Sequence, residues 1–211
     1  EGKTGFGYWG RVVKYGLLRR YPQKNHYLLA SSAYAAADYA LLHEFRGRAL
    51  RWGYFPQTMH YDLPQLMAGK EPCSILWVAR LIPLKHPEYA IQAAKQLRKQ
   101  GFRFTLELVG NGEMQQELET LVAKEGLQPW VKLTGACTPE EVRRKMERAA
   151  VFLFTSDQNE GWGAVANEAM NSGCAVVACH ATGSAPFLIE DGKNGLLFEV
   201  NDQAGLTEKI R

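Results

Sequence analysis

The sequence predicts an α/β fold in which a doubly wound parallel sheet carries helices on both faces. From residue 73 onward, short apolar runs that are typical of strands alternate with longer stretches that are typical of helices. This alternation indicates a parallel sheet, because parallel strands need crossover helices to connect them. Apolar residues make up 46% and charged residues 22% of the 211 residues, which is the composition of a globular protein with a substantial core.

The first 55 residues predict the tail end of a preceding α/β domain. They read as a strand over 27–31, a helix over 32–45 capped by Ser32, and a strand over 49–52. These elements cannot bury a sheet by themselves. The next stretch, residues 56–72, contains three prolines and no clear period, so we expect an interdomain linker there.

Residues 10–20 predict an amphipathic helix in which apolar residues such as Val13 and Leu17 interleave with cations such as Lys14. Such a helix can lie on an anionic membrane surface and give peripheral membrane contact. The alternative is a helix whose apolar side packs on a protein domain and whose cations are solvated. The sequence leaves both interpretations open.

In the domain expected over 73–211, the elements follow one another regularly. Thr138, Pro139 and Glu141 have the spacing of a helix N-cap with a capping box. The expected strands cover 74–79, 104–109, 131–133, 151–154, 175–178 and 196–198, and the expected helices cover 88–100 and 113–125, start at 138 and 164, and cover 202–211. Because Arg211 falls inside the last of these helices and Glu1 is not an initiator methionine, we interpret the sequence as part of a longer chain.

The bulk properties exclude several classes of protein. A net charge of +3 gives no reason to expect a nucleic-acid partner. No apolar run approaches the roughly 20 residues of a membrane span, and the first residues lack the apolar region of a signal peptide. The four cysteines form no CxxC pair and no cluster with histidines. We therefore expect free thiols in a reducing cytosol and no metal site.

Charged residues and glycines follow the strands, at the edge where a parallel sheet binds its ligand. Arg80 and Lys85 follow the strand over 74–79, and an arginine fork beside a mobile ammonium suits a diphosphate. Gly110-Asn111-Gly112 follows the next strand and forms a tight turn that lets another backbone approach. It lacks the third glycine of the dinucleotide fingerprint.

The stretch 157–170 combines a glycine-punctuated loop, the start of a helix and two carboxylates, Glu160 and Glu168. Backbone N–H groups at a helix N-terminus favour an anion, and carboxylates accept hydrogen bonds from hydroxyl groups. Each residue also has a structural alternative. Glu160 could complete a capping box with Asp157, and Glu168, Arg80 and Lys85 could be solvated surface charges.

The segment Glu160-Gly161-Trp162-Gly163, followed by Asn167-Glu168-Ala169-Met170, resembles the E-x7-E motif of retaining GT-B glycosyltransferases (glycosyl transferases group 1, glycosyltransferase family 4-like). The resemblance runs from about Cys73 to Arg211 and includes Arg80 and Lys85. It implies a Rossmann-like, C-terminally truncated donor-binding domain over 73–211. Residues 1–55 would then be the end of the acceptor domain, and 56–72 the linker.

The resemblance also implies a role for each matching residue. Arg80 and Lys85 would bind the diphosphate of a UDP-sugar or GDP-sugar and stabilise it as leaving group. Glu160 would bind sugar hydroxyls and Glu168 the ribose hydroxyls. The acceptor would be a saccharide or glycolipid in polysaccharide or glycolipid synthesis, at the inner face of the membrane in the cytoplasm. Neither a metal ion nor another cofactor would be needed. The other donor-binding residues that it implies are Gly110, Gly112, Gly161, Trp162, Gly163, Ala164 and Val165.

The sequence departs from the family pattern at a few positions. His86 and Ser184 stand where glycine is usual, and Phe187 stands where glutamate is usual. The rival interpretations are a nucleotide-sugar-binding fragment without turnover, a sugar-nucleotide epimerase, and an α/β scaffold without a ligand. The set of Arg80, Lys85 and the two glutamates favours transfer, although we expect this fragment alone to be inactive.

Overall fold

The computed structural model describes residues 6–18 and 25–211. The chain forms two compact units, Glu1–Tyr54 and Phe55–Arg211, and each is described here by itself. The described part of the expected N-terminal basic helix is α1 (Phe6–Leu18), while Arg19 and Arg20 lie outside the described residues. Within these residues no helix combines the length and the apolar character that spanning a membrane requires.

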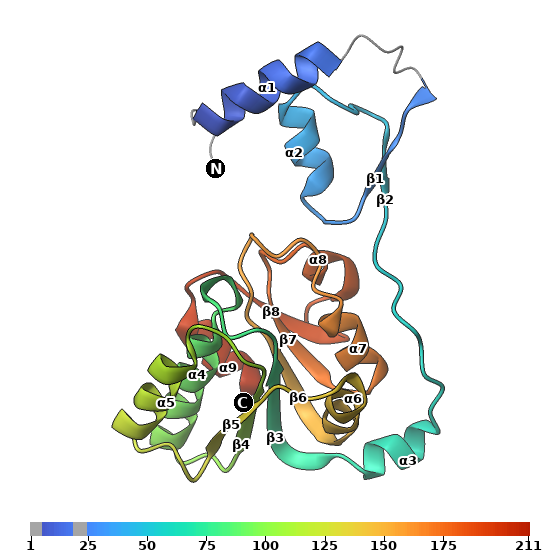
Figure 1. Ribbon diagram of the computed structural model, residues 1–211. Coiled ribbons are helices and arrows are strands. Elements are labelled where there is room, and N and C mark those ends of the chain that lie inside the picture. The colour runs from blue at the N-terminus through green and yellow to red at the C-terminus, as the bar shows by residue number, and fades with distance from the viewer. Residues whose placement is uncertain (1–5, 19–24) are drawn as a thin grey trace. The chain divides into compact units, whose positions relative to one another are not determined.

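The first unit contains two short parallel strands, β1 (Leu28–Ala30) and β2 (Ala49–Arg51), connected through α2 (Ala35–Leu41) (Figure 1). The helix expected over 32–45 is shorter than predicted at both ends. Its N-cap is Tyr34, because the Ser32 hydroxyl accepts a hydrogen bond from the Tyr34 N–H and forms a separate turn. At the other end His43 and Phe45 have φ values of 61° and 49°, which an α-helix cannot contain.

The second unit is built on a six-stranded, fully parallel sheet with the order β5-β4-β3-β6-β7-β8 (Figure 1). This confirms the predicted doubly wound α/β fold. Each apolar run expected as a strand forms one, with ends shifted by up to three residues. The strands are β3 (Glu71–Val78), β4 (Thr105–Val109), β5 (Val131–Gly135), β6 (Ala149–Phe154), β7 (Ala175–Cys179) and β8 (Gly195–Phe198).

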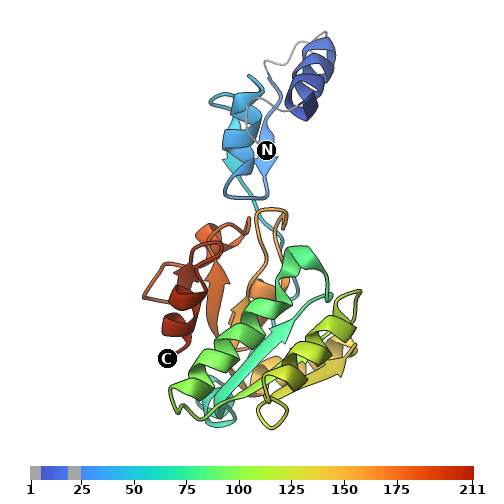
Figure 2. The same ribbon diagram turned by 90° about the vertical axis from the view of Figure 1, so that its left-hand side faces the viewer.

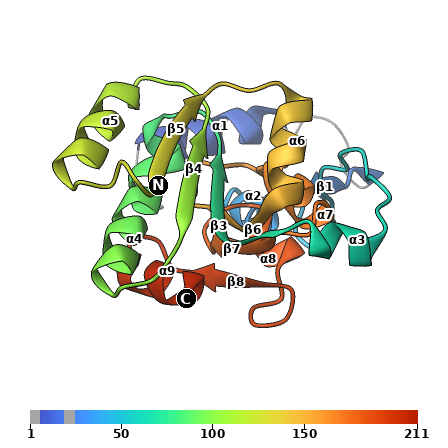
Figure 3. The ribbon, with the colours of Figure 1, turned by 90° about the horizontal axis from the view of Figure 1, so that it is seen from below.

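Helices cover both faces of this sheet, as Figure 3 shows along the strands. Figure 2 shows the face covered by α4 (Pro87–Lys99) and α5 (Gln115–Lys124). Alternate residues of β3 enter two different cores, because successive strand side chains point to opposite faces. Ile75 and Trp77 pack in the core that contains residues of α4, α5 and α9 (Gln203–Ile210). Leu76 packs in the core that contains residues of α6 (Pro139–Arg148), α7 (Val165–Asn171) and α8 (Ala185–Leu188). This two-sided burial explains why the strands are continuous apolar runs.

The helices of this unit begin and end close to the predicted positions, with two additions. The capping box is confirmed: Thr138 accepts from the Glu141 N–H, and Glu141 accepts from the Thr138 N–H. A helix, α3, lies within 56–72, and α8 follows β7, where only a loop was expected. The helices are α3 (Leu63–Ala68), α4 (Pro87–Lys99), α5 (Gln115–Lys124), α6 (Pro139–Arg148), α7 (Val165–Asn171), α8 (Ala185–Leu188) and α9 (Gln203–Ile210).

The strand order reverses between β3 and β6, which are neighbours although β4 and β5 lie between them in the chain. From β3 the chain winds outward to β4 and β5, and from β6 it winds outward in the other direction to β7 and β8. The loops that follow β3 and β6 therefore diverge at one point of the sheet edge. In doubly wound sheets this is the point where ligands bind.

Candidate functional site

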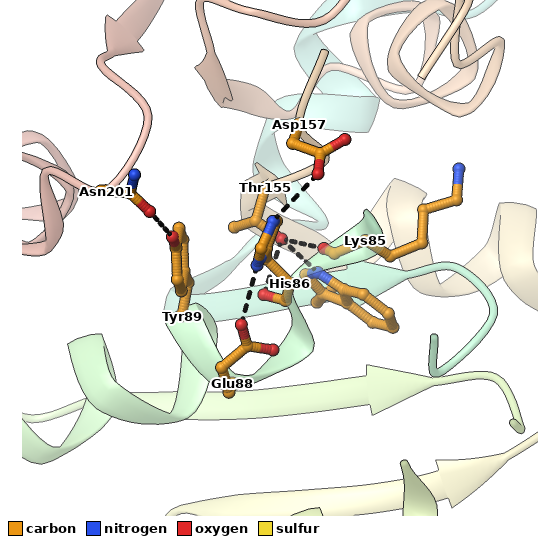
Figure 4. Close-up of polar contacts among 8 residues, drawn as sticks. Lys85, His86, Glu88, Tyr89, Thr155, Asp157 and Asn201 are labelled. Carbon is orange, nitrogen blue, oxygen red and sulfur yellow. Dashed lines mark hydrogen bonds and ion pairs between the residues drawn. The ribbon is translucent and has the colours of Figure 1, made fainter. Parts of the chain in front are cut away.

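The loop after β3 and the loop after β6 are joined by hydrogen bonds at this point of strand reversal. The Asp157 N–H donates to the Leu84 carbonyl at 3.0 Å. The hydroxyl of Thr155 donates to the Lys85 carbonyl at 2.6 Å and accepts from the Trp77 indole N–H at 2.8 Å (Figure 4). Thr155 is 1% exposed. These buried contacts fix the backbone around Lys85 against the end of β6.

Lys85 and Glu160 form an ion pair across the two loops. Their side chains are only 16% and 14% exposed, so the pair is screened less than a surface pair would be. The alternative in which Glu160 completes a capping box with Asp157 is wrong. The Asp157 carboxylate accepts instead from the Asn159 N–H at 2.8 Å, and Glu160 lies before α7 rather than inside a helix.

Burial lowers the pKa of the Lys85 ammonium from its ordinary value, the nearby Arg80 guanidinium lowers it further, and Asp157 opposes both effects. Arg80 itself is exposed. Two cations thus lie within electrostatic reach of each other at the end of β3. Their mutual repulsion would be relieved by an anion that contacts both.

His86 connects the same two loops with its side chain. Its Nδ1 lies 2.8 Å from Glu88, its Nε2 lies 3.4 Å from Asp157, and its ring stacks on Tyr89 at 4.6 Å (Figure 4). The backbone of His86 has φ 47° and ψ 53°, which is the left-handed region that glycine adopts most readily. Glycine, which the resemblance leads us to expect at this position, would adopt this conformation readily, and here His86 adopts it.

Two glycines after β4 are required by close backbone contact with the loop after β3. A Cβ atom at Gly110 would lie 1.8 Å from the Ala79 carbonyl oxygen, and one at Gly112 would lie 2.2 Å from that of Leu81. The Leu81 N–H donates to the Asn111 carbonyl at 2.8 Å. The backbone that approaches this turn is thus that of the Arg80 loop.

The loop before α7 contains one open glycine and one enclosed glycine. A Cβ atom at Gly161 would have no atom within 4 Å, whereas one at Gly163, which has φ +77°, would lie 2.1 Å from the Phe154 ring. Trp162 is 4% exposed, and its indole N–H donates to Asn167 at 2.8 Å. The Trp162 side chain therefore anchors the loop to α7. Ala164 is the N-cap of α7 and Val165 is its first residue.

Glu168 lies on α7 and lines a pocket of about 270 Å³. The walls are mainly apolar, and no described residue makes a hydrogen bond or ion pair to the Glu168 carboxylate. Arg143 of α6 lines the same pocket, and its Nη1 nitrogen is buried without a hydrogen-bond acceptor among the described residues. The remaining lining residues are Val78, Cys137, Pro139, Val142, Met146 and Val165.

The structure thus brings Arg80, Lys85 and Glu160 to one place and puts Glu168 in a pocket at the end of β3. Sequence reasoning missed Thr155 and Arg143. Thr155 could have been found as a polar residue directly after an apolar strand, whereas Arg143 stands in a charged run of α6 that gives no such signal. In residues 6–18 and 25–211, no group of three or more His, Cys, Asp or Glu side chains could hold a metal ion.

Comparison with known proteins identifies the family. The family model for glycosyl transferases group 1 matches residues 63–211. The chain belongs to this family. The GT-B fold that the resemblance implies also agrees with a solved structure, that of HepE from Anabaena in complex with UDP. HepE is 24% identical in sequence to this chain, and the two structures superpose with a TM-score of 0.77. The match covers 99% of this chain and 58% of the HepE chain.

The curated relatives that resemble this chain include an amylovoran biosynthesis glycosyltransferase, AmsK, of Erwinia amylovora. It is 33% identical over 161 residues, which are 74% of this chain and 39% of AmsK. The GtfA subunit of a UDP-N-acetylglucosamine–peptide N-acetylglucosaminyltransferase of Streptococcus gordonii is 29% identical over 159 residues, which are 71% of this chain and 31% of that protein. The chain thus spans less than half the length of these relatives.

Proposed function

We propose that this chain forms the donor-binding part of a glycosyltransferase that takes its sugar from a nucleotide diphosphate sugar. The observation that carries the proposal is the meeting of Lys85, Arg80 and Glu160 where the strand order reverses. Cations suit the diphosphate of such a donor and carboxylates suit its sugar hydroxyls. The family and the biosynthetic relatives support polysaccharide or glycolipid synthesis as the setting.

Arg80 and Lys85 would hold the donor diphosphate. When the bond from the anomeric carbon to the diphosphate oxygen breaks, the electron pair stays on the diphosphate, and negative charge grows there. Cations that already face this charge lower the barrier without reorganisation. They also supply the role that a metal ion has in other phosphoryl and glycosyl chemistry, so we infer that this enzyme needs neither a metal ion nor another cofactor.

The ion pair between Lys85 and Glu160 would change when the donor binds. The diphosphate carries more negative charge than one carboxylate and competes for the Lys85 ammonium. Glu160 would then accept hydrogen bonds from hydroxyls of the donor sugar. The backbone at Gly161 to Ala164 precedes α7 and would approach the sugar and phosphate, with open space at Gly161.

The nucleoside of the donor would occupy the pocket beside Glu168. A carboxylate without a partner among the described residues is suited to accept hydrogen bonds from the two ribose hydroxyls. The apolar walls, which include Val78 and Val142, would contact the flat faces of a base. HepE was solved with UDP bound, and this supports UDP as the first nucleotide to test, with GDP as the second.

The family resemblance supports transfer with retention of the anomeric configuration. The acceptor hydroxyl oxygen would then form its bond to the anomeric carbon on the face that the diphosphate leaves. The hydroxyl proton would pass to the departing diphosphate oxygen. A saccharide or a lipid-linked saccharide is the acceptor that we infer.

We also infer a cytoplasmic protein with peripheral contact to the membrane, through α1. On this helix Trp9, Val13 and Leu17 recur at every fourth position, and they are 60%, 59% and 68% exposed. Arg11 and Lys14 are the cations of the same helix, and α1 contains no acidic residue. Sedimentation with vesicles of anionic and of neutral lipids tests this contact. Binding that is absent from both kinds of vesicle would contradict it.

Calorimetric titration of the chain with UDP, GDP and ADP tests the proposed function. We expect UDP or GDP to bind, and Lys85→Met to weaken that binding by about 10-fold or more, because a charge-assisted contact to phosphate is lost. Lys124→Met, at an exposed position on α5, is the matched control. Absence of binding by every nucleoside diphosphate would contradict the proposal. Incubation of the chain with a nucleotide sugar separates transfer from epimerisation. Inversion of a carbon centre in the sugar without an acceptor would indicate an epimerase instead.

A further inference from the structure

We propose that Arg143 selects the nucleobase of the donor by donating a hydrogen bond to an exocyclic carbonyl oxygen. This inference rests on the proposed function, because it assumes that a nucleoside occupies the pocket beside Glu168. It adds a specificity-determining residue on α6, outside the loops that would hold the diphosphate and the sugar.

The first observation is an unpaired donor. The Nη1 nitrogen of Arg143 is buried, and it has no hydrogen-bond acceptor among the described residues. A guanidinium cannot lose its proton in a protein and has donors only, so it can be satisfied only by an acceptor. Leaving a buried charged donor unpaired is unfavourable, and a ligand that carries an acceptor into the pocket would correct this.

The second observation is the place of this donor. Arg143 and Glu168 line the same pocket from two different helices, α6 and α7. The two side chains form no ion pair with each other, so both remain available to a ligand. If Glu168 takes the ribose hydroxyls, the part of the pocket lined by Arg143, Cys137 and Pro139 remains for the base.

The chemistry of the bases then decides which nucleotides fit this pocket. Uracil and guanine carry exocyclic carbonyl oxygens, which accept hydrogen bonds from the guanidinium. Adenine has no exocyclic carbonyl oxygen. It carries an amino group, which is itself a donor, where guanine carries its carbonyl oxygen, and its acceptors are ring nitrogens at other positions. An adenine base would therefore not place an exocyclic acceptor at Arg143. A site that is built to hydrogen-bond one group discriminates strongly against a ligand that lacks it. Arg143 would therefore favour UDP and GDP over ADP.

The test compares Arg143→Met with Arg144→Met in the 211-residue chain. Arg144 is the next residue of α6, is exposed, and does not line this pocket, so the two variants change the net charge equally. Calorimetry gives the affinities for UDP and ADP, and displacement of UDP gives the affinity for uridine, which has no phosphate. We expect Arg143→Met to weaken the binding of UDP and of uridine by the same factor, about 10- to 100-fold.

The same variant should change ADP affinity little, so that the preference for UDP over ADP falls. Its melting temperature without ligand should not fall, because the substitution removes an unpaired buried donor. Arg143→Lys keeps the charge without the planar fork, and should restore part of the UDP affinity. Arg144→Met should match the wild type in all these measurements.

Each of the following results would overturn the inference. If Arg143→Met weakens the binding of UDP and of ADP equally, or weakens the binding of UDP but not of uridine, Arg143 contacts phosphate. A lower melting temperature with unchanged UDP affinity would show that Arg143 only supports the fold. If the wild type binds no nucleoside diphosphate, the proposed function fails and the inference fails with it. If the wild type binds UDP and Arg143→Met binds it equally well, only the inference fails.

Discussion

His86 and Asp157 lie 3.4 Å apart, from ring Nε2 to carboxylate oxygen, across the two loops that also carry Lys85 and Glu160 (Figure 4). The histidine occupies a left-handed backbone conformation, with φ 47°, that disfavours any residue with a Cβ atom. Its contacts with Asp157, Glu88 and Tyr89 offset that strain. The loop geometry that glycine would give by its backbone is here held by a side chain.

This relationship predicts an order of stability for two substitutions of His86. Both His86→Ala and His86→Gly lose the ring contacts, but only the alanine keeps the backbone strain. We therefore expect His86→Gly to be more stable than His86→Ala by about 1 kcal/mol, measured by urea unfolding. Equal stability of the two variants would show that the backbone at His86 is not strained.

Arg80→Ala should reduce sugar transfer by the full-length protein about 10²- to 10³-fold, because one preformed donor to the leaving diphosphate is lost. The fold should stay intact, since Arg80 is exposed. The rate of donor consumption with acceptor present measures the effect. Arg103→Ala, at an exposed position before β4, is the control. A turnover of Arg80→Ala close to that of Arg103→Ala would remove Arg80 from the mechanism.

Gly110→Ala should destabilise the second unit by about 3 kcal/mol, because its Cβ atom would lie 1.8 Å from the Ala79 carbonyl oxygen and the neighbouring backbone would have to move. Gly161→Ala is the matched control. A Cβ atom there meets no atom within 4 Å, so we expect little change in the free energy of unfolding. Similar losses for the two variants would contradict the close contact between the loops after β3 and β4.

We expect the lowered pKa of Glu107 to make the protein less stable in acid. Burial raises the pKa of this carboxyl, but hydrogen bonds from Lys145 and Thr134 outweigh it and hold the pKa below its ordinary value of 4.5. Because the unfolded state then binds the proton more tightly, this contribution is full above pH 4.5 and is lost as the pH falls through the lowered value. Glu107→Gln should reduce the slope of unfolding free energy against pH below 4.5. The exposed Glu117→Gln on α5 is the control, and an unchanged slope in Glu107→Gln would contradict this assignment.

The sequence by itself predicted most of the second unit. Continuous apolar runs marked the strands, and the spacing of Thr138, Pro139 and Glu141 marked the start of α6, because these signals are local. The prediction of the helix over 32–45 failed where single residues adopt a backbone conformation that ends a helix. The left-handed residues His43 and Phe45 end α2 early, and a left-handed conformation in a residue other than glycine leaves little trace in the sequence.

The candidate site also has a part that the sequence predicted and a part that only the tertiary structure reveals. The sequence placed Arg80, Lys85, Glu160 and Glu168 after strands, and that alone put them at one edge of a parallel sheet. Only the tertiary structure made β3 and β6 neighbours and so paired Lys85 with Glu160 across 75 positions of sequence. It alone placed Arg143 beside Glu168. Strand order and side-chain burial depend on packing between distant segments, and no local pattern of residues records that packing.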